Sequence, residues 1–70
     1  MKTYIVNIET RKNDRDDVLG PFSSFKKAQQ AILERKGDWV LNYDEYDSDF
    51  SKGKIYTEEE SIEILERELE

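Results

Sequence analysis

The fold is decided by the stretch GPFSSFKKAQQAILERKG, residues 20–37. Its apolar residues recur at helical spacing from Phe25 to Ile32, as they do on a helix with one buried face. A serine at 23 or 24 can accept from the free N–H groups of a first turn. Gly37 suits the position just after a last turn, and basic residues precede it. The stretch therefore predicts a helix over 24–36 that follows a strand ending near Gly20-Pro21.

On the N-terminal side of this helix, residues 3–9 alternate between apolar and polar. Tyr4, Val6 and Ile8 fall on one face, which predicts a half-buried strand. A polar tip follows over 11–17, and Val18-Leu19 returns briefly to apolar character. This order predicts a hairpin whose second strand is short.

On the C-terminal side, residues 39–46 alternate again, with Trp39, Leu41 and Tyr43 on one side. This pattern predicts another strand. A polar loop follows over 47–53, and we expect residues 54–56, Lys-Ile-Tyr, to form a short strand that pairs back with 39–46.

The last segment has the pattern of a second helix. Thr57 and Glu60 match a capping box, and Ile62, Leu65 and Leu69 recur at helical spacing, so we expect a helix over 58–69. The fold class is then α+β: one small domain over 1–70, with an antiparallel sheet of three to four strands and two helices in the order β-β-α-β-β-α.

Composition excludes several classes of protein. The chain has 70 residues, with no cysteine and no histidine. A Cys nucleophile, a His general base, a disulfide framework and a common zinc site are therefore impossible. We expect a protein that is not an enzyme and uses no cofactor. So small a core buries only about 60% of the unfolded surface, which leaves a homodimer open as a way to pool cores.

The chain also lacks a segment for a membrane. No apolar run approaches the roughly 18 residues that a span needs. The N-terminal residues turn polar too soon for a signal peptide. We therefore expect a soluble cytoplasmic protein that makes no membrane contact.

The net charge of −6 is distributed unevenly. Residues 1–37 carry eight Lys/Arg and five Asp/Glu, a net of +3, whereas residues 38–70 carry three Lys/Arg and twelve Asp/Glu, a net of −9. An acidic helix face can serve solubility alone. However, like charges at helical spacing past the first turn, such as Glu63 and Glu66, cost stability and indicate another use.

We interpret the acidic half as a surface that imitates nucleic-acid phosphates. A row of Glu on a helix has a spacing similar to that of phosphates along a DNA strand, so it could occupy the basic groove of a DNA-binding protein. The same charge argues against direct nucleic-acid binding. The residues predicted to contact the partner are Asp44, Glu45, Asp47, Asp49, Glu59, Glu63, Glu66 and Glu70.

Two other functions remain open. Residues 47–58 place oxygen donors at relative positions 1, 3, 5 and 12, as a calcium loop requires, although a lysine replaces the glycine at position 6. The chain could also be a small structural or assembly protein that contacts its partner through apolar faces.

The hairpin, the Gly20-Pro21-Phe22-x-Ser24 exit, the amphipathic helix and the acidic tail together resemble small acidic host-takeover proteins of lytic Bacillus phages. One member of this group inhibits the histone-like protein HU by acting as a DNA mimic. The resemblance covers size, acidity and layout. It implies a basic host DNA-binding protein as the partner, and the host cytoplasm as the location.

Overall fold

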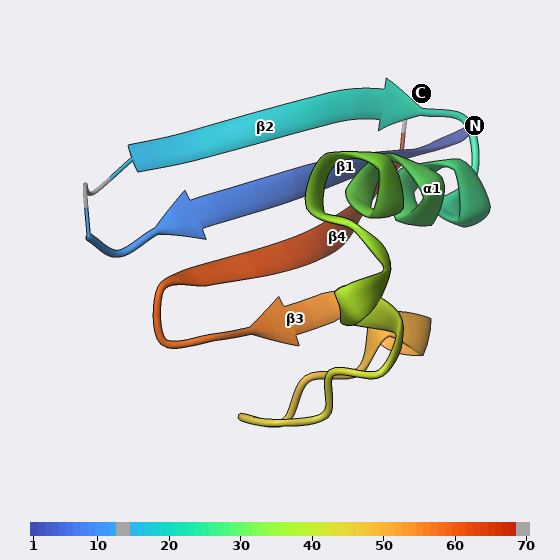
Figure 1. Ribbon diagram of the computed structural model, residues 1–70. Helices are drawn as coiled ribbons and strands as arrows, with labels where there is room; N and C mark the ends of the chain where they lie inside the picture. Colours follow the sequence, from blue (N-terminus) through green and yellow to red (C-terminus); the bar gives the residue numbers. More distant parts are fainter. Residues whose placement is uncertain (13–14, 69–70) are drawn as a thin grey trace.

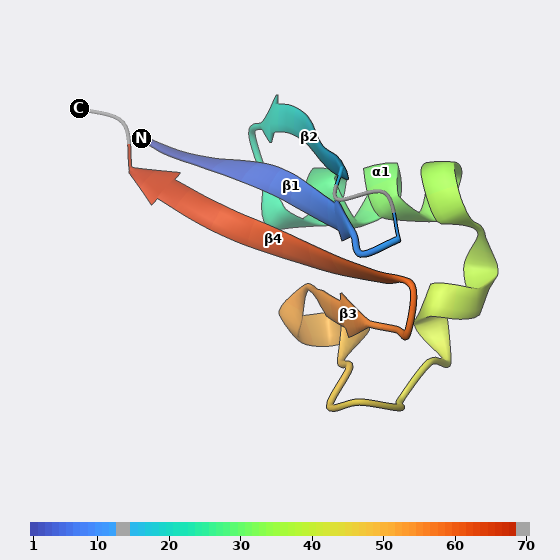
Figure 2. The same cartoon turned by 90° about the vertical axis from the view of Figure 1, so that its left-hand side faces the viewer.

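The computed structural model describes residues 1–12 and 15–68, which form one antiparallel sheet with a single α-helix over one face (Figures 1 and 2). The strands lie in the order β2-β1-β4-β3. This arrangement confirms the α+β class and the four-stranded antiparallel sheet. The elements are β1 (Lys2–Thr10), β2 (Arg15–Phe22), α1 (Phe25–Lys36), the 3-10 turns η1 (Asp38–Leu41) and η2 (Phe50–Lys52), β3 (Lys54–Tyr56) and β4 (Glu60–Glu68).

Helix α1 begins and ends where the sequence predicts. The backbone N–H of Lys27 donates to Ser24 Oγ at 3.1 Å, which satisfies one free donor of the first turn. At the other end, the N–H of Gly37 donates to the carbonyl of Leu33 at 2.8 Å, and Gly37 has φ of 101°. The predicted apolar stripe is confirmed, because α1 buries Ala28 and Ile32.

The predicted N-terminal hairpin is confirmed, and its second strand is longer than expected. β1 and β2 pair antiparallel from Thr10↔Arg15 to Tyr4↔Phe22, with a register shift between Tyr4 and Val6. A cis peptide bond joins Gly20 and Pro21 on the partner strand near this shift. Leu19 lies opposite Val6, so both apolar residues face α1.

The predicted helix over 58–69 is wrong, because residues 60–68 form strand β4. β4 pairs with β1 along its whole length, from Thr10↔Glu60 to Lys2↔Glu68. Ile62 and Ile64 alternate with polar Ser61 and Glu63, and this period of two competes with the helical stripe that begins at the same Ile62. The strand prevails because it gives the backbone of β1 a partner along the side that faces away from β2.

The capping-box pattern at 57–60 forms a hairpin turn instead of a helix start. Thr57 Oγ1 accepts from the backbone N–H groups of Glu59 at 3.1 Å and Glu60 at 3.0 Å. The N–H of Thr57 donates to the carbonyl of Glu60 at 2.8 Å and closes the turn between β3 and β4. A threonine hydroxyl makes the same local bonds in helix caps and in turns, so the pattern alone does not separate the two.

The predicted strand over 39–46 is also wrong. This segment contains η1 and an irregular stretch that passes along the sheet edge without joining it. Val40 is fully buried, whereas Trp39 and Leu41 are 41% and 52% exposed, the reverse of the predicted faces. The predicted strand at 54–56 is confirmed as β3, but its partner is β4.

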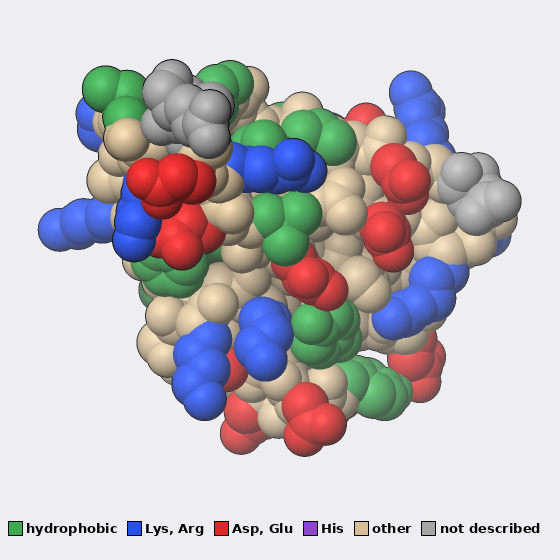
Figure 3. Space-filling view, turned by 180° about the vertical axis from the view of Figure 1, so that it is seen from behind, with side chains coloured by type: hydrophobic (Ala, Val, Ile, Leu, Met, Phe, Trp, Pro, Cys, Tyr) green, Lys and Arg blue, Asp and Glu red, His purple; other side chains and the backbone are tan. Residues whose placement is uncertain are grey.

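The core lies between α1 and the inner face of the sheet. Among the described residues, the buried apolar side chains are Val6, Ile8, Ala28, Ile32, Val40, Ile55 and Ile62. The opposite face of the sheet has no covering layer within the described part of the chain, and charged and apolar side chains alternate across it (Figure 3). No helix within the described ranges is long and apolar enough to cross a membrane.

Candidate binding pocket

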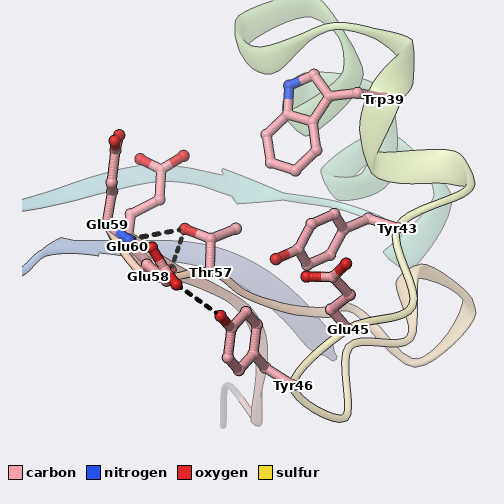
Figure 4. A pocket seen from close by; sticks show the side chains of 8 residues that line it. All are labelled: Trp39, Tyr43, Glu45, Tyr46, Thr57, Glu58, Glu59 and Glu60. Carbon is pink, nitrogen blue, oxygen red and sulfur yellow. Dashed lines mark hydrogen bonds between the residues drawn. The ribbon is translucent and has the colours of Figure 1, made fainter.

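A pocket of about 450 Å³ opens between the segment after α1 and the β3–β4 turn (Figure 4). Three aromatic rings and four carboxylates line it, and we call it the aromatic–acidic pocket. Its residues are Trp39, Tyr43, Glu45, Tyr46, Thr57, Glu58, Glu59 and Glu60. Its volume lies within the range of small-molecule and side-chain sites, about 300–1,000 Å³.

The aromatic side of the pocket is held by specific contacts. Trp39 Nε1 donates to the carbonyl of Lys36 at 2.8 Å, which ties the indole to the end of α1. Trp39 and Tyr43 pack edge to face, with ring centroids 5.5 Å apart and an interplanar angle of 84°. Tyr46 lies below them and donates from its hydroxyl to Glu58 Oε1 at 3.0 Å (Figure 4). The rings are therefore fixed although Trp39 and Tyr46 are 41% and 53% exposed.

The acidic side comes mainly from the β3–β4 turn. Glu60 forms an ion pair with Lys36, Nζ to Oε2 at 2.7 Å, and both side chains are mostly buried. The side chains of Glu45 and Glu59 make no hydrogen bond or ion pair with any residue that the structure describes. Four carboxylates and one ammonium leave a formal net charge of −3 at the pocket. Arg11 lies close to the turn, where it donates to the Thr57 carbonyl and Ser61 Oγ.

The surroundings of the pocket raise the pKa of its two tyrosines. Burial, followed by the charges of Glu45 and Glu58, raises the pKa of the Tyr43 phenol above its ordinary value of 10.0. The hydrogen bond to Glu58 raises the pKa of Tyr46, and burial and the same charges add to it. Both phenols stay neutral at physiological pH, so they offer the pocket π faces and hydroxyl groups.

Two of the eight acidic residues predicted to bind a partner, Glu45 and Glu59, line this pocket from opposite sides (Figure 4). Asp44 and Asp49 line a second hollow of about 630 Å³ beside Tyr43. Asp49 is engaged there, because it accepts from both the N–H and the hydroxyl of Ser51, and these bonds lower its pKa.

The other predicted residues lie apart from the pocket. Asp47 is exposed at the tip of the loop, in the left-handed region with φ of 62°. Glu63 accepts from the hydroxyl of Tyr56 at 3.0 Å on the uncovered face. Glu66 pairs with Lys2, Nζ to Oε1 at 3.3 Å. Glu70 lies outside the described residues.

The predicted row of carboxylates is therefore not formed. Successive residues of a strand point to opposite faces, so Glu63 faces away from Glu60 and Glu66. Six residues of strand also place Glu66 about 20 Å from Glu60. The acidic residues of the last segment thus separate into the pocket, the uncovered face and the end of β4.

The oxygen donors of the 47–58 loop do not converge on one point where a calcium ion could bind. Asp49 is bonded to Ser51, and Glu58 accepts from Tyr46 at the opposite end of the loop. Within the described residues, no three Asp, Glu, Cys or His side chains come close enough to hold a metal ion.

The aromatic half of the pocket is not predicted from the sequence, because the alternation over 39–46 places Trp39 and Tyr43 on one side of a strand that does not form. A signal was present: these two residues are four apart, the spacing of neighbours on a helical turn. Three aromatic residues interspersed with acids over 39–46 would also have indicated a cation-binding surface.

Comparison with protein-family models, with curated protein sequences and with solved structures found no match to this chain.

Proposed function

We propose that this protein is a non-catalytic binding module that engages a basic segment of a protein partner through the aromatic–acidic pocket. The observation that carries the proposal is the combination of exposed, fixed aromatic rings with two carboxylates, those of Glu45 and Glu59, that have no cationic partner among the described residues. Aromatic side chains anchor interfaces, and a site that is already rigid loses little entropy on binding. The excess of acid over residues 38–70, a net of −9, would steer a basic partner toward this half of the molecule.

The partner proposed is a host DNA-binding protein, of which histone-like HU is the example suggested by the resemblance to phage host-takeover proteins. Such a protein presents Lys and Arg side chains to phosphates. If the pocket holds some of these side chains, DNA and this protein compete for the same groups. The inhibition does not need carboxylates at phosphate spacing, which strand β4 does not provide.

A binding role also agrees with the chemistry that the chain offers. It has no histidine or cysteine, so a nucleophile or general base would have to come from carboxylates or hydroxyls. Tyr43 and Tyr46 have raised pKa values, so an even smaller fraction of each is in the phenolate form, the form that acts as a base, at neutral pH. The pocket is open on its outer side and suits contact with a protein surface (Figure 4).

The test measures the affinity of the protein for purified bacterial HU by isothermal titration calorimetry at several salt concentrations. The pocket variant is Glu45→Gln with Glu59→Gln. The control is Glu63→Gln with Glu66→Gln, which lie outside the pocket. Each pair changes the formal net charge from −6 to −4, so general electrostatic attraction falls equally.

We expect the pocket pair to weaken binding by about tenfold or more, and the control pair by about threefold or less. Affinity should also fall steeply as salt rises. Equal losses from both pairs would show that only net charge matters, and no binding of HU at low salt would refute this partner.

A second candidate is self-association through the uncovered sheet face. Ile5 and Leu65 lie side by side there, and Val18 is 63% exposed on the neighbouring part of the sheet. Sedimentation of the wild-type protein and of Leu65→Glu tests it. A concentration-dependent dimer that the substitution abolishes would support a homodimer, and a monomer at all concentrations would exclude it.

A further inference from the structure

The aromatic–acidic pocket has the composition of a site for one organic cation. Trp39, Tyr43 and Tyr46 present rings on one side, and the carboxylates of Glu58 and Glu59 lie on the other (Figure 4). A cation over the face of an aromatic ring is attracted by the ring quadrupole, most strongly by tryptophan. Carboxylates beside the rings add direct charge pairing. The two halves therefore complement the same kind of ligand.

From this combination we infer that the pocket receives a single arginine side chain of the basic partner. The inference rests on the proposed function and names the group that the pocket binds. The ligand is thus a guanidinium group on a protein segment, which would contact the aromatic rings, the carboxylate of Glu45 beside Tyr43 and the carboxylate of Glu59 across the pocket (Figure 4).

The rings are placed for this role before any ligand arrives. The hydrogen bond from Trp39 Nε1 to the Lys36 carbonyl fixes the indole, and its edge-to-face contact fixes Tyr43. Tyr46 adopts φ of 57°, a left-handed conformation that is uncommon for a bulky residue. In this conformation its hydroxyl donates to Glu58, and that hydrogen bond helps to hold the third ring at the pocket.

The described residues neutralise the charge of the pocket only in part. Lys36 pairs with Glu60, and Arg11 is occupied by the Thr57 carbonyl and Ser61 Oγ. Glu45 and Glu59 have no such partner among the described residues. An incoming cation would therefore meet two carboxylates that need not first release a protein group.

Arginine fits these features better than lysine. Its guanidinium is planar, stacks on aromatic rings and offers five donors to several acceptors at once. A lysine ammonium is a compact and strongly hydrated charge, so it gains less from the rings and loses more water. Three rings with separate carboxylates thus favour arginine.

The test is a titration of the full chain with a blocked Gly-Arg-Gly tripeptide, followed by the indole N–H and backbone amide signals in NMR spectra. Tripeptides with lysine or citrulline at the centre are matched ligands, since citrulline keeps the shape of arginine without its charge. We expect the arginine peptide to shift the signals of the Trp39 indole and of residues 45–60. It should bind at least about threefold more tightly than the lysine peptide, and the citrulline peptide should not displace it.

Variants then locate the site. Tyr46→Leu removes one ring. Glu59→Gln removes one carboxylate charge from an exposed turn position, where loss of folding is not expected. Both should weaken arginine binding, whereas Tyr56→Phe, on the uncovered face, should leave it unchanged. The inference is overturned if the pocket signals do not move at about 20 mM arginine peptide, well above the millimolar affinity expected for one side chain. Equal binding of lysine, or shifts confined to other surfaces, would overturn it as well.

The outcomes for the two proposals are separable. Arginine binding without any binding of HU retains this inference and refutes the proposed partner. Binding of HU that the arginine peptide and Tyr46→Leu leave unchanged retains the partner and refutes this inference.

Discussion

Replacing Ile64 or Leu65 with alanine tests which side of the last segment is buried. In strand β4, Ile64 lies opposite Val6 and packs against the core, while Leu65 lies opposite Ile5 on the uncovered face. A helix with the stripe Ile62, Leu65 and Leu69 would bury Leu65 and expose Ile64. Strand β4 therefore predicts that Ile64→Ala lowers the free energy of unfolding more than Leu65→Ala does. A helix would predict the reverse.

Both side chains are partly buried, so the magnitudes follow from what each one packs against. Ile64 is partly buried and lies against Gly53, where a Cβ would stand only 2.9 Å from Ile64 Cβ. Its loss removes apolar surface and leaves a cavity, so Ile64→Ala should cost about 2–3 kcal/mol. Leu65→Ala removes the contact with Ile5 on the uncovered face, where water can fill the vacated space, and should cost about 1 kcal/mol.

Both variants should remain folded enough to measure, because a chain of this length has a free energy of unfolding of about 3.5–10 kcal/mol. The assay is urea unfolding followed by far-UV circular dichroism, with thermal melting as a second measurement. One kcal/mol corresponds to about 4–8 °C in Tm for a domain of this size, so Ile64→Ala should melt about 8–24 °C lower. If Leu65→Ala costs as much as Ile64→Ala or more, the strand assignment is refuted.

Four other predictions concern a turn, the tyrosines and calcium. Gly53→Ala should destabilise the protein by more than about 1 kcal/mol in the same urea assay, because Gly53 has φ of 73° and a Cβ would crowd Ile64 and the Phe25 ring; an unchanged midpoint would contradict this packing. Stability should decline as pH rises through about 10, because Tyr43, Tyr46 and Tyr56 have pKa values raised above the ordinary 10.0 and so hold their protons more tightly folded than unfolded. Glu58→Gln should lower the pKa of Tyr46 toward that value in a spectrophotometric titration, and an unchanged tyrosine titration would contradict the hydrogen bond between them. Calcium at millimolar concentration should leave Tm and Trp39 fluorescence unchanged, since the oxygen donors of the 47–58 loop are apart; a rise in Tm would revive the calcium function.

The first half of the fold could be predicted because its local and long-range signals agree. Ser24 and Gly37 cap a helix whose apolar stripe matches one period, and β1 alternates almost without exception. In the hairpin that precedes the helix, the residues that favour a turn all fall in one polar stretch, 11–17. Each of these elements is specified by residues close together in the sequence.

The second half could not be predicted, because its local signals fit two structures. Ile62 starts both a helical stripe and an alternating run, and Thr57 makes turn bonds that also occur in helix caps. The choice depends on β1, more than fifty residues away, which needs a partner for its backbone. The pocket depends on the same choice, since Glu58, Glu59 and Glu60 meet the aromatic rings only when β4 begins with a hairpin turn.

We propose that the aromatic–acidic pocket, and not acidity in general, makes this protein a competitor of DNA. The most direct measurement is displacement of a fluorescent DNA duplex from HU, followed by anisotropy, with wild-type protein and the two charge-matched pairs. We predict that Glu63→Gln with Glu66→Gln displaces DNA nearly as well as wild type, whereas Glu45→Gln with Glu59→Gln needs about tenfold more protein. Equal displacement by the two pairs, or none by the wild type, would contradict the claim.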